Sequence, residues 1–396
     1  MYWTLAIFAG LVFTYSLISH KVEKVGLSGP IVFVALGIVL SPLGFGVFSP
    51  APNGIGRSIV DVTLALFLFV DAAAADLGVL RRNWRLPGRM LVFGLPMAIA
   101  FGSVCAAWIF PELSLYEAAI LGTMLAATDA ALGKAVVTNK AVPDYLREGL
   151  SAESGLNDGL AVPFLLLFIA LEQGSAVRGE GVALELMAEE LGIGLIVGVV
   201  VAYFAANLLR AARSAGWLSR VWQQVTIPAL AIAIFGIAQS LHGSGYIAAF
   251  VGGLCFRGWM KEDVHALIEP AEGVGEVLAM VAWIVFGLLL VPAALPLIDA
   301  RAVIYALLSL TVIRMLPIII SLAGTGERMA AKSFLAWFGP RGLASLAFAI
   351  IVWGEDIANA PRMISVTVLT VLLCLVAHGI TAQPLGRRIA AAYAKA

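Results

Sequence analysis

Four residues in two neighbouring apolar segments have the chemistry to bind a small cation. Thr128 and Asp129 interrupt one segment, and Ser154 and Asp158 lie in the next. Hard cations prefer oxygen ligands, and a cation that leaves water needs carboxylates, hydroxyls and backbone carbonyls in place of its hydration shell. Two nearby carboxylates in a low-dielectric site also disfavour double ionisation, so one of them can hold either a proton or a cation. Competition between proton and cation at one carboxylate is an exchange mechanism.

The spacing of the acidic residues separates two roles. On a helix that turns about 100° per residue, Ser154 and Asp158 share a face, whereas Glu153 lies about 140° away from Asp158. We therefore predict a functional Asp158 and a structural Glu153. A buried Glu153 needs a cationic partner, and both Arg314 and Arg341 lie inside apolar segments.

Composition places these residues in a membrane. Of the 396 residues, 61% are hydrophobic and 13% are charged, whereas soluble domains carry about a quarter charged residues. Apolar stretches of roughly 20 residues, the length that crosses a bilayer, recur along the chain and leave no room for a sizeable soluble domain. The 25 basic and 25 acidic residues balance, and no basic run is dense enough for nucleic-acid binding. The three cysteines and four histidines are scattered, so we expect no disulfide and no cofactor.

The fold class that follows is an all-α polytopic membrane protein, one transporter unit over residues 1–396. About 13 transmembrane spans are predicted, the first of them a retained helix because no signal-peptide cleavage site follows it. Six spans, a linker span and six more would form two inverted repeats, and the breaks at 128–129 and 338–342 then correspond, which indicates discontinuous helices at an ion site. The predicted spans are 2–18, 28–45, 57–76, 88–110, 115–138, 148–171, 183–208, 220–240, 243–257, 272–296, 301–322, 330–353 and 362–384.

Basic residues predict the orientation, because cytoplasmic loops are enriched in Lys and Arg. Eighteen of the 25 basic residues fall at one set of alternate loops and span ends or in the C-terminal tail. The opposite set holds four: Arg57, Arg178, Arg301 and Arg362. We therefore predict a multi-pass protein of the cell (inner) membrane with its N-terminus outside and its C-terminus in the cytoplasm.

Three motifs resemble those of the cation:proton antiporter family, which includes NhaP-like bacterial sodium/proton antiporters and the eukaryotic sodium/proton exchangers. The segment Glu-Ser-x-x-Asn-Asp is the most specific of them, and the similarity extends over nearly the whole chain. Weaker matches lie at 67–72 in the third span, which also carries Asp61, Asp71 and Asp76, and at 245–250. The motifs are Ala127-Thr128-Asp129, Ala152-Glu153-Ser154-Gly155-Leu156-Asn157-Asp158-Gly159 and Phe338-Gly339-Pro340-Arg341-Gly342-Leu343-Ala344-Ser345.

The resemblance implies a role for each ligand residue. Asp158 becomes the essential carboxylate that binds the ion and the proton, with Asp129, Ser154 and the backbone of Thr128 as further ligands of a monovalent cation. Family members that have Asn before the essential aspartate, as Asn157 stands here, exchange one cation for one proton and are electroneutral. The Asn157 amide can also join helices without adding charge.

The resemblance also bears on the other charges inside the spans. It favours Arg314 over Arg341 as the partner of Glu153, and Arg341 stays a further functional candidate. Two residues depart from the family pattern: Ala130 stands where Pro often follows Thr-Asp, and Lys134 is unexpected within a span. We predict that the Lys134 side chain extends to the cytoplasmic interface.

The function expected is secondary antiport of sodium or lithium against protons, serving pH homeostasis, by a homodimer in membrane lipid. Core helices at about 88–171 and 301–384 would move against dimerisation helices at about 1–76 and 183–296, so that Asp158 has alternating access to the two sides. Potassium/proton antiport is an alternative, because oxygen ligands alone do not fix ion size. An intramembrane aspartyl hydrolase using Asp129 and Asp158 is a remote one, since the sequence lacks a Gly-x-Gly-Asp context. An ion channel is a further alternative. The prediction is a transporter and no enzyme.

Overall fold

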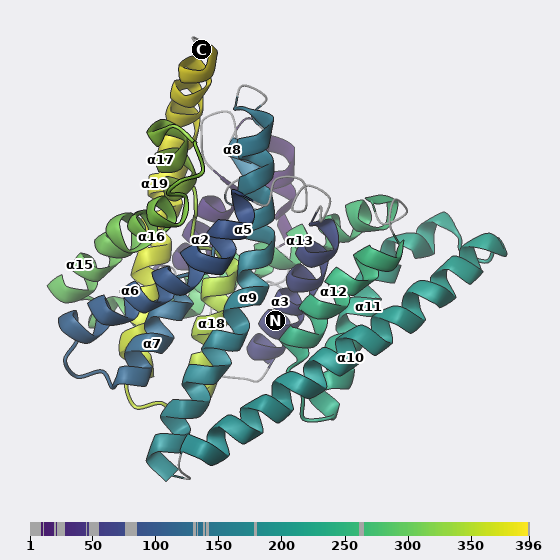
Figure 1. The fold of residues 1–396 in the computed structure, drawn as a ribbon, viewed down its shortest axis with the longest axis horizontal. Helices are drawn as coiled ribbons and strands as arrows, with labels where there is room; N and C mark the ends of the chain where they lie inside the picture. Colours follow the sequence, from purple (N-terminus) through teal and green to yellow (C-terminus); the bar gives the residue numbers. More distant parts are fainter. Residues whose placement is uncertain are drawn as a thin grey trace.

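The computed structural model describes residues 9–10, 12–19, 21, 28–44, 46, 55–75, 85–129, 132, 134–137, 139, 142–177, 180–260 and 265–394. These residues form helices and connecting turns, and no strand occurs among them (Figure 1). Residues 9–10 and 12–19 are helical. The further helices are α2 (Gly29–Leu40), α3 (Ile55–Ala74), α5 (Pro87–Arg89), α6 (Leu95–Ile109), α7 (Leu115–Met124), α8 (Lys134–Val137), α9 (Asp144–Val177), α10 (Glu180–Ser214), α11 (Arg220–Ser240), α12 (Gly245–Met260), α13 (His265–Val285), α14 (Val291–Ala294), α15 (Ala300–Leu308), α16 (Arg314–Ser321), α17 (Met329–Trp337), α18 (Leu343–Gly354) and α19 (Ala360–Ala394).

Short segments of other helix types join several of these helices end to end. The π-helical segments Met90–Gly94, Phe286–Leu290 and Ser309–Ile313 connect α5 to α6, α13 to α14 and α15 to α16. A 3₁₀ turn at Leu295–Leu297 follows α14. Each π-helical segment inserts an extra residue into an α-helix and so changes which side chains face the protein interior beyond it.

The helices are apolar enough for a multi-pass membrane protein. In the described part of the chain, seven helical stretches are long and apolar enough to cross a bilayer: Pro87–Ile109, Asp144–Gly174, Leu184–Ser214, Trp222–Ser240, Leu267–Leu297, Ala300–Ser321 and Ala360–Tyr393. Each predicted span from 28–45 onward contains a helix, so the all-α class is confirmed. The number of 13 spans and the inverted repeats stay predictions.

Several helix ends lie four or more residues from the predicted boundaries, and two of them illustrate the cause. Helix α9 begins at Asp144 rather than near 148, and α19 continues to Ala394 rather than ending near 384. Hydropathy detects only the apolar length of a helix, whereas polar residues such as Arg147 and Arg387 continue the helix beyond it. The predicted spans were therefore too short at these polar ends.

One group of helices packs through small residues. Helices α3, α10, α11, α12 and α13 share a buried apolar cluster and lie together on one side of the molecule (Figure 1). A Cβ at Gly253 of α12 would lie 2.3 Å from Phe69 O of α3, and one at Gly198 of α10 would lie 2.6 Å from Ala248 O of α12. Such contacts are typical of membrane helices, whose association depends on close packing.

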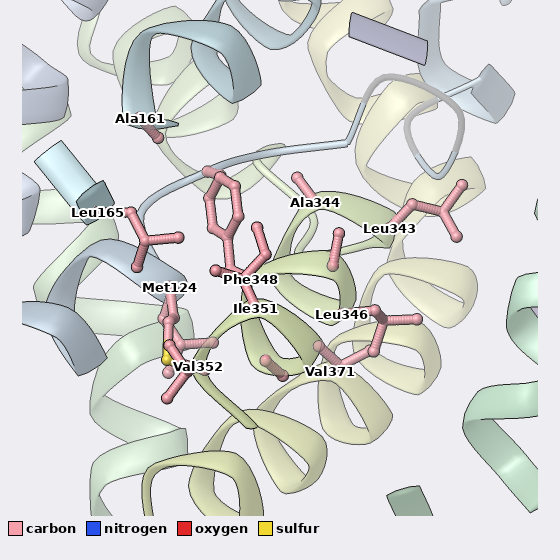
Figure 2. Close-up of a cluster of buried hydrophobic side chains, with 14 of the residues drawn as sticks. Met124, Ala161, Leu165, Leu343, Ala344, Leu346, Phe348, Ile351, Val352 and Val371 are labelled. Carbon is pink, nitrogen blue, oxygen red and sulfur yellow. The ribbon is translucent and has the colours of Figure 1, made fainter. Parts of the chain in front are cut away.

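Helix α18 is the centre of a second region. Phe348 and Val352 of α18 lie among Leu165 of α9, Met124 of α7 and Val371 of α19 (Figure 2). All five side chains are buried. Helix α18 is therefore enclosed by helices that come from distant parts of the sequence.

The two regions meet along α9, which contacts α3, α10 and α12. At Gly159 a Cβ would lie 2.0 Å from the ring of Phe250 of α12, so only glycine allows this approach. The large apolar cluster extends across both regions. The predicted division into core helices and dimerisation helices stays a prediction.

Candidate ion-binding site

The interruptions predicted in two spans lie against each other. Helix α7 ends at Met124 and residues 127–129 are non-helical, while α17 ends at Trp337 and α18 begins at Leu343. The backbone N–H of Asp129 donates to Pro340 O over 2.7 Å. Non-helical backbone at this depth is tolerated where protein encloses it, and Thr128, Asp129 and Arg341 are all buried.

The Asp129 side chain caps helix α18. Its Oδ2 accepts a hydrogen bond of 2.9 Å from the backbone N–H of Leu343, the first residue of α18. A carboxylate at a helix N-terminus is stabilised by the unpaired N–H groups and by the helix dipole. Gly342 allows the contact, because a Cβ there would lie 1.9 Å from Asp129 Oδ2. The predicted ligand Asp129 thus also positions the second broken helix.

Helix α9 is tied to the first break through Asn157. Its Nδ2 donates to Thr128 Oγ1 over 3.1 Å and to Glu153 Oε1 over 2.9 Å. Thr128 Oγ1 lies 3.4 Å from Glu153 Oε2 and 3.5 Å from Ser154 Oγ. Asn157 is fully buried, so its amide supplies Thr128 and Glu153 with hydrogen bonds that they do not receive from water.

Glu153 and Arg314 form a buried ion pair. Arg314 Nη2 lies 2.9 Å from Glu153 Oε1, and the two side chains are 1% and 0% exposed. The guanidinium fills the space beside Gly339, where a Cβ would lie 2.4 Å from Arg314 Nε. Each charge compensates the burial of the other, which would otherwise cost several kcal/mol. Arg314 follows the π-helical segment Ser309–Ile313 directly.

Arg341 makes its hydrogen bonds to backbone carbonyls, and Arg314 rather than Arg341 forms the ion pair with Glu153. Arg341 Nη1 donates to Gly339 O over 2.6 Å and its Nη2 donates to Ser309 O over 3.2 Å. Ser309 begins the π-helical segment, where backbone carbonyls lose regular helical partners. Arg341 therefore joins the break before α18 to the irregular part of the α15–α16 helix.

One carboxylate oxygen of Asp158 lacks a hydrogen bond in the part of the chain that the structure describes. The residue is buried, and its Oδ1 has no hydrogen-bond partner among the described residues. The carboxyl groups of Asp129, Asp71 and Glu153 lie close enough to act on it electrostatically, and the backbone of Thr128 contributes a favourable contact. A buried carboxylate oxygen without a partner is costly, and binding a proton or a cation removes that cost.

Asp71 of α3 is a site residue that the sequence interpretation did not select. A Cβ at Gly155 of α9 would lie 3.8 Å from Asp71 Cβ, so this carboxylate lies beside the α9 segment that bears Ser154 and Asp158. Its position within an apolar span was a usable signal, because ionisable residues inside membranes are functional candidates by default. Ala130, Asp76 and the side chain of Lys134 lie outside the described residues.

The grouped residues suit a monovalent cation better than a tightly held transition metal. Over the described ranges, no three His, Cys, Asp or Glu side chains form a metal-binding group. The oxygens available are carboxylate, hydroxyl and backbone oxygens, which are the ligands of alkali and other hard cations.

The family model described as "Sodium/hydrogen exchanger, transmembrane" matches residues 8–388. The chain belongs to this sodium/hydrogen exchanger family. The predicted cation:proton antiporter resemblance is confirmed, and with it the expectation of a secondary transporter rather than an enzyme.

The names of similar proteins specify different cations. The chain is 23% identical over 384 residues to the K(+)/H(+) antiporter NhaP of Alkalimonas amylolytica, covering 96% of this chain and 65% of that one. It is 26% identical over 361 residues to Na(+)/H(+) antiporter 2 of Zygosaccharomyces rouxii, covering 85% and 44%. The chain thus spans less than two thirds of the length of these curated exchanger relatives.

The solved structure of the sodium proton antiporter MjNhaP1 from Methanocaldococcus jannaschii at pH 8 has the same fold. It superposes with a TM-score of 0.80 at 18% identity, covering 98% of this chain and 100% of that one. The exchanger fold of this chain is thereby established along nearly its full length.

Proposed function

We propose that this chain exchanges a monovalent cation for protons across the membrane, and that Asp158 is the carboxylate at which the two compete. The observation that carries the proposal is the unpartnered, buried Asp158 Oδ1. Three acidic neighbours act on it, so its negative charge needs a positive partner. A proton and a cation each supply one, and each excludes the other.

The cation would find its remaining ligands around the first break. Ser154 shares a helix face with Asp158, and Thr128 and Asp129 reach the same place from the other segment. We propose Ser154, the Thr128 backbone and Asp129 as ligands beside Asp158, with Asn157 positioning Thr128 through the bond of 3.1 Å. Glu153 and Arg314 compensate each other at 2.9 Å and are assigned a structural role.

One exchanging carboxylate makes the transport electroneutral. If Asp158 alone alternates between a protonated and a cation-bound form, the site carries the same net charge in both. Glu153 is paired with Arg314, and Asn157 is neutral, which leaves no second exchanging charge on this part of α9. We therefore propose one cation for one proton.

Sodium, or lithium, is the cation that we propose, and potassium is the alternative. The names of the relatives include both Na(+)/H(+) and K(+)/H(+) antiporters, and the ligand types do not separate the two ions. Sodium follows from the resemblance of the Glu-Ser-x-x-Asn-Asp motif.

We also propose how the molecule moves and assembles. Core helices at about 88–171 and 301–384 would move against the remaining helices and carry Asp158 from one side to the other. The chain would act as a homodimer in the inner membrane, with its N-terminus outside and its C-terminus in the cytoplasm, and would serve pH homeostasis. The close contact between Gly159 and Phe250 lies where these two groups would slide.

Proteoliposomes with an imposed pH gradient test the exchange. Sodium, lithium and potassium are added in turn to vesicles that contain the wild type or D158N. We expect sodium and lithium to collapse the gradient in the wild type, without generating a membrane potential, and no ion to do so in D158N. Full cation-driven proton flux in D158N would exclude Asp158 as the exchanging group. Collapse by potassium alone would overturn the sodium assignment, and a persistent uncoupled current would indicate a channel.

A further inference from the structure

The break between α17 and α18 is held from a third helix, α19. His378 Nε2 lies 2.8 Å from Trp337 O, the carbonyl of the last residue of α17. Four residues earlier on α19, Cys374 Sγ accepts the backbone N–H of Arg341 over 3.0 Å. Residues four apart share a helix face, so one face of α19 supplies a hydrogen bond to each side of the break.

The bond from His378 is a second one to Trp337 O, which also accepts the backbone N–H of Gly339 over 2.8 Å, and the bond to Cys374 satisfies a backbone N–H inside the break. The last carbonyls of α17 have no intrahelical donors, and the Arg341 N–H lies outside both helices. Because a carbonyl only accepts, His378 Nε2 must carry the hydrogen of the bond to Trp337. The His378 ring also stacks on the Trp337 ring, with centroids 5.2 Å apart and planes inclined by 22°. His378 and Cys374 are buried, so water does not replace their hydrogen bonds easily.

The anchored Arg341 N–H lies between the two backbone groups that meet Asp129. Pro340 O accepts the Asp129 N–H, and the Leu343 N–H donates to Asp129 Oδ2. Pro340 and Leu343 lie within two residues of the anchored Arg341. Any shift of the break would therefore move both contacts of Asp129 together.

We propose that Cys374 and His378 are positioning residues, which set the affinity of the ion site by fixing the shape of the α17–α18 break. This inference rests on the proposed exchange at Asp158 and Asp129. The two side chains bind no ion themselves. They act through Arg341 and Trp337 on the backbone that holds Asp129.

Paired variants separate positioning from bulk packing. The amide nitrogen of Gln is as many bonds from Cβ as His Nε2, so H378Q keeps a donor for Trp337 O, whereas the shorter H378N does not reach it. In the same way C374S keeps an acceptor for the Arg341 N–H, and C374A removes it. T367V is the matched control, because buried Thr367 on α19 bonds only to Met363 O of its own helix.

Sodium-driven proton flux in proteoliposomes gives the half-saturating cation concentration and the maximal rate separately. We expect H378N and C374A to raise the half-saturating concentration about fivefold, the effect of losing one hydrogen bond. In H378Q, C374S and T367V the half-saturating concentration should stay within about twofold of the wild-type value, because no hydrogen bond to the break is lost. Wild-type half-saturation in both H378N and C374A would overturn the proposal, as would equal losses in H378N and H378Q.

Amide hydrogen exchange in detergent tests the anchor without transport. In C374A the peptide covering 338–343 should exchange faster than in C374S, because the Arg341 N–H has lost its acceptor. Equal exchange in these two variants would overturn the proposal even where flux changes. If the wild type transports no cation, the proposed function fails, and the exchange rates still decide whether the anchor exists.

Discussion

Leu343 N–H donates to Asp129 Oδ2 over 2.9 Å, across 214 residues of sequence. The Asp129 side chain therefore caps the N-terminus of helix α18, which lies in the other half of the chain. Between the two residues lies Gly342, which has no Cβ to obstruct the contact. The crossing of the two breaks, residues 127–129 and 338–342, depends on Gly342 as much as on the Asp129 carboxylate.

Replacing Gly342 by Ala should disrupt the crossing. The new Cβ would lie 1.9 Å from Asp129 Oδ2 and 2.4 Å from Asp129 Cβ, so either the cap of α18 or the position of Asp129 must change. We expect a stability loss of about 1–3 kcal/mol, typical of overpacking, and no cation-driven flux. Thermal melting in detergent and proteoliposome flux measure the two effects.

Gly149→Ala is the control for G342A. A Cβ at Gly149 of α9 would have only Leu86 Cβ within 4 Å, at 3.8 Å, which is ordinary contact. This variant should melt and transport as the wild type does. Normal flux in G342A would show that Asp129 does not need its present contacts with α18.

Neutralising Glu153 should mainly reduce folding. In E153Q the Arg314 guanidinium remains buried opposite a neutral amide, and breaking a buried pair from one side costs about 3–5 kcal/mol. We expect a lower folded yield and a lower melting temperature, with E153L/R314M recovering part of the loss. The exposed Glu148 of α9 gives the control E148Q, which should behave as the wild type. An E153Q protein that melts normally but lacks flux would assign Glu153 to the ion path instead.

Much of the fold was predictable because a bilayer imposes a simple rule. A span needs about 20 apolar residues, so the apolar segments from 28–45 onward each contain a helix. The polar continuation of α19 to Ala394 was missed, since hydropathy does not register it. The π-helical segment Ser309–Ile313 was missed too, because an inserted residue leaves no mark on composition.

The residue types at the site were predictable, and their partners were less so. The helical periodicity of about 100° per residue placed Glu153 and Asp158 on different faces of one helix. In the structure Glu153 contacts Arg314, while Asp158 Oδ1 has no partner in the described residues. The helical wheel left Arg341 as an equal candidate, because periodicity within one helix does not tell which distant helix faces it. The cap that Asp129 forms on α18 and the approach of Asp71 also depend on contacts between distant segments.

The contact between Gly159 and Phe250 gives a test of movement between the helix groups. In G159A the new Cβ would lie 2.0 Å from the Phe250 ring, which forces α9 and α12 apart. We expect a stability loss of about 1–3 kcal/mol and slower sodium-driven flux, both recovered in part by G159A/F250L. Gly258→Ala on α12, where nothing lies within 4 Å, is the control. Unchanged flux in G159A would mean that α9 does not slide on α12 here.

An ion-pair cluster at the ends of two helical spans predicts how stability depends on pH, and its carboxylate Asp299 lies just before the span Ala300–Ser321. Asp299 precedes α15, and Arg362 Nη2 donates to its Oδ2 over 2.6 Å. Partial burial opposes ionisation, but the Ala302 N–H, Arg362 and Arg301 outweigh it and lower the pKa of Asp299 from its ordinary value of 3.8. A lowered folded-state pKa means that the stabilisation is complete above the unfolded value and is lost as pH falls through the folded value.

We therefore expect the melting temperature of the wild type to fall as pH drops below about 4, with a smaller fall in D299N. Asn keeps an oxygen for the Ala302 N–H, so the difference reports the charge rather than the helix cap. R362M should reduce the same pH dependence, and the effects of D299N and R362M should be less than additive, because Asp299 and Arg362 form an ion pair with each other. Melting curves between about pH 3 and 7 in detergent measure this, a range that brackets the ordinary carboxyl pKa. A D299N protein with the full wild-type dependence would show that other carboxylates account for it.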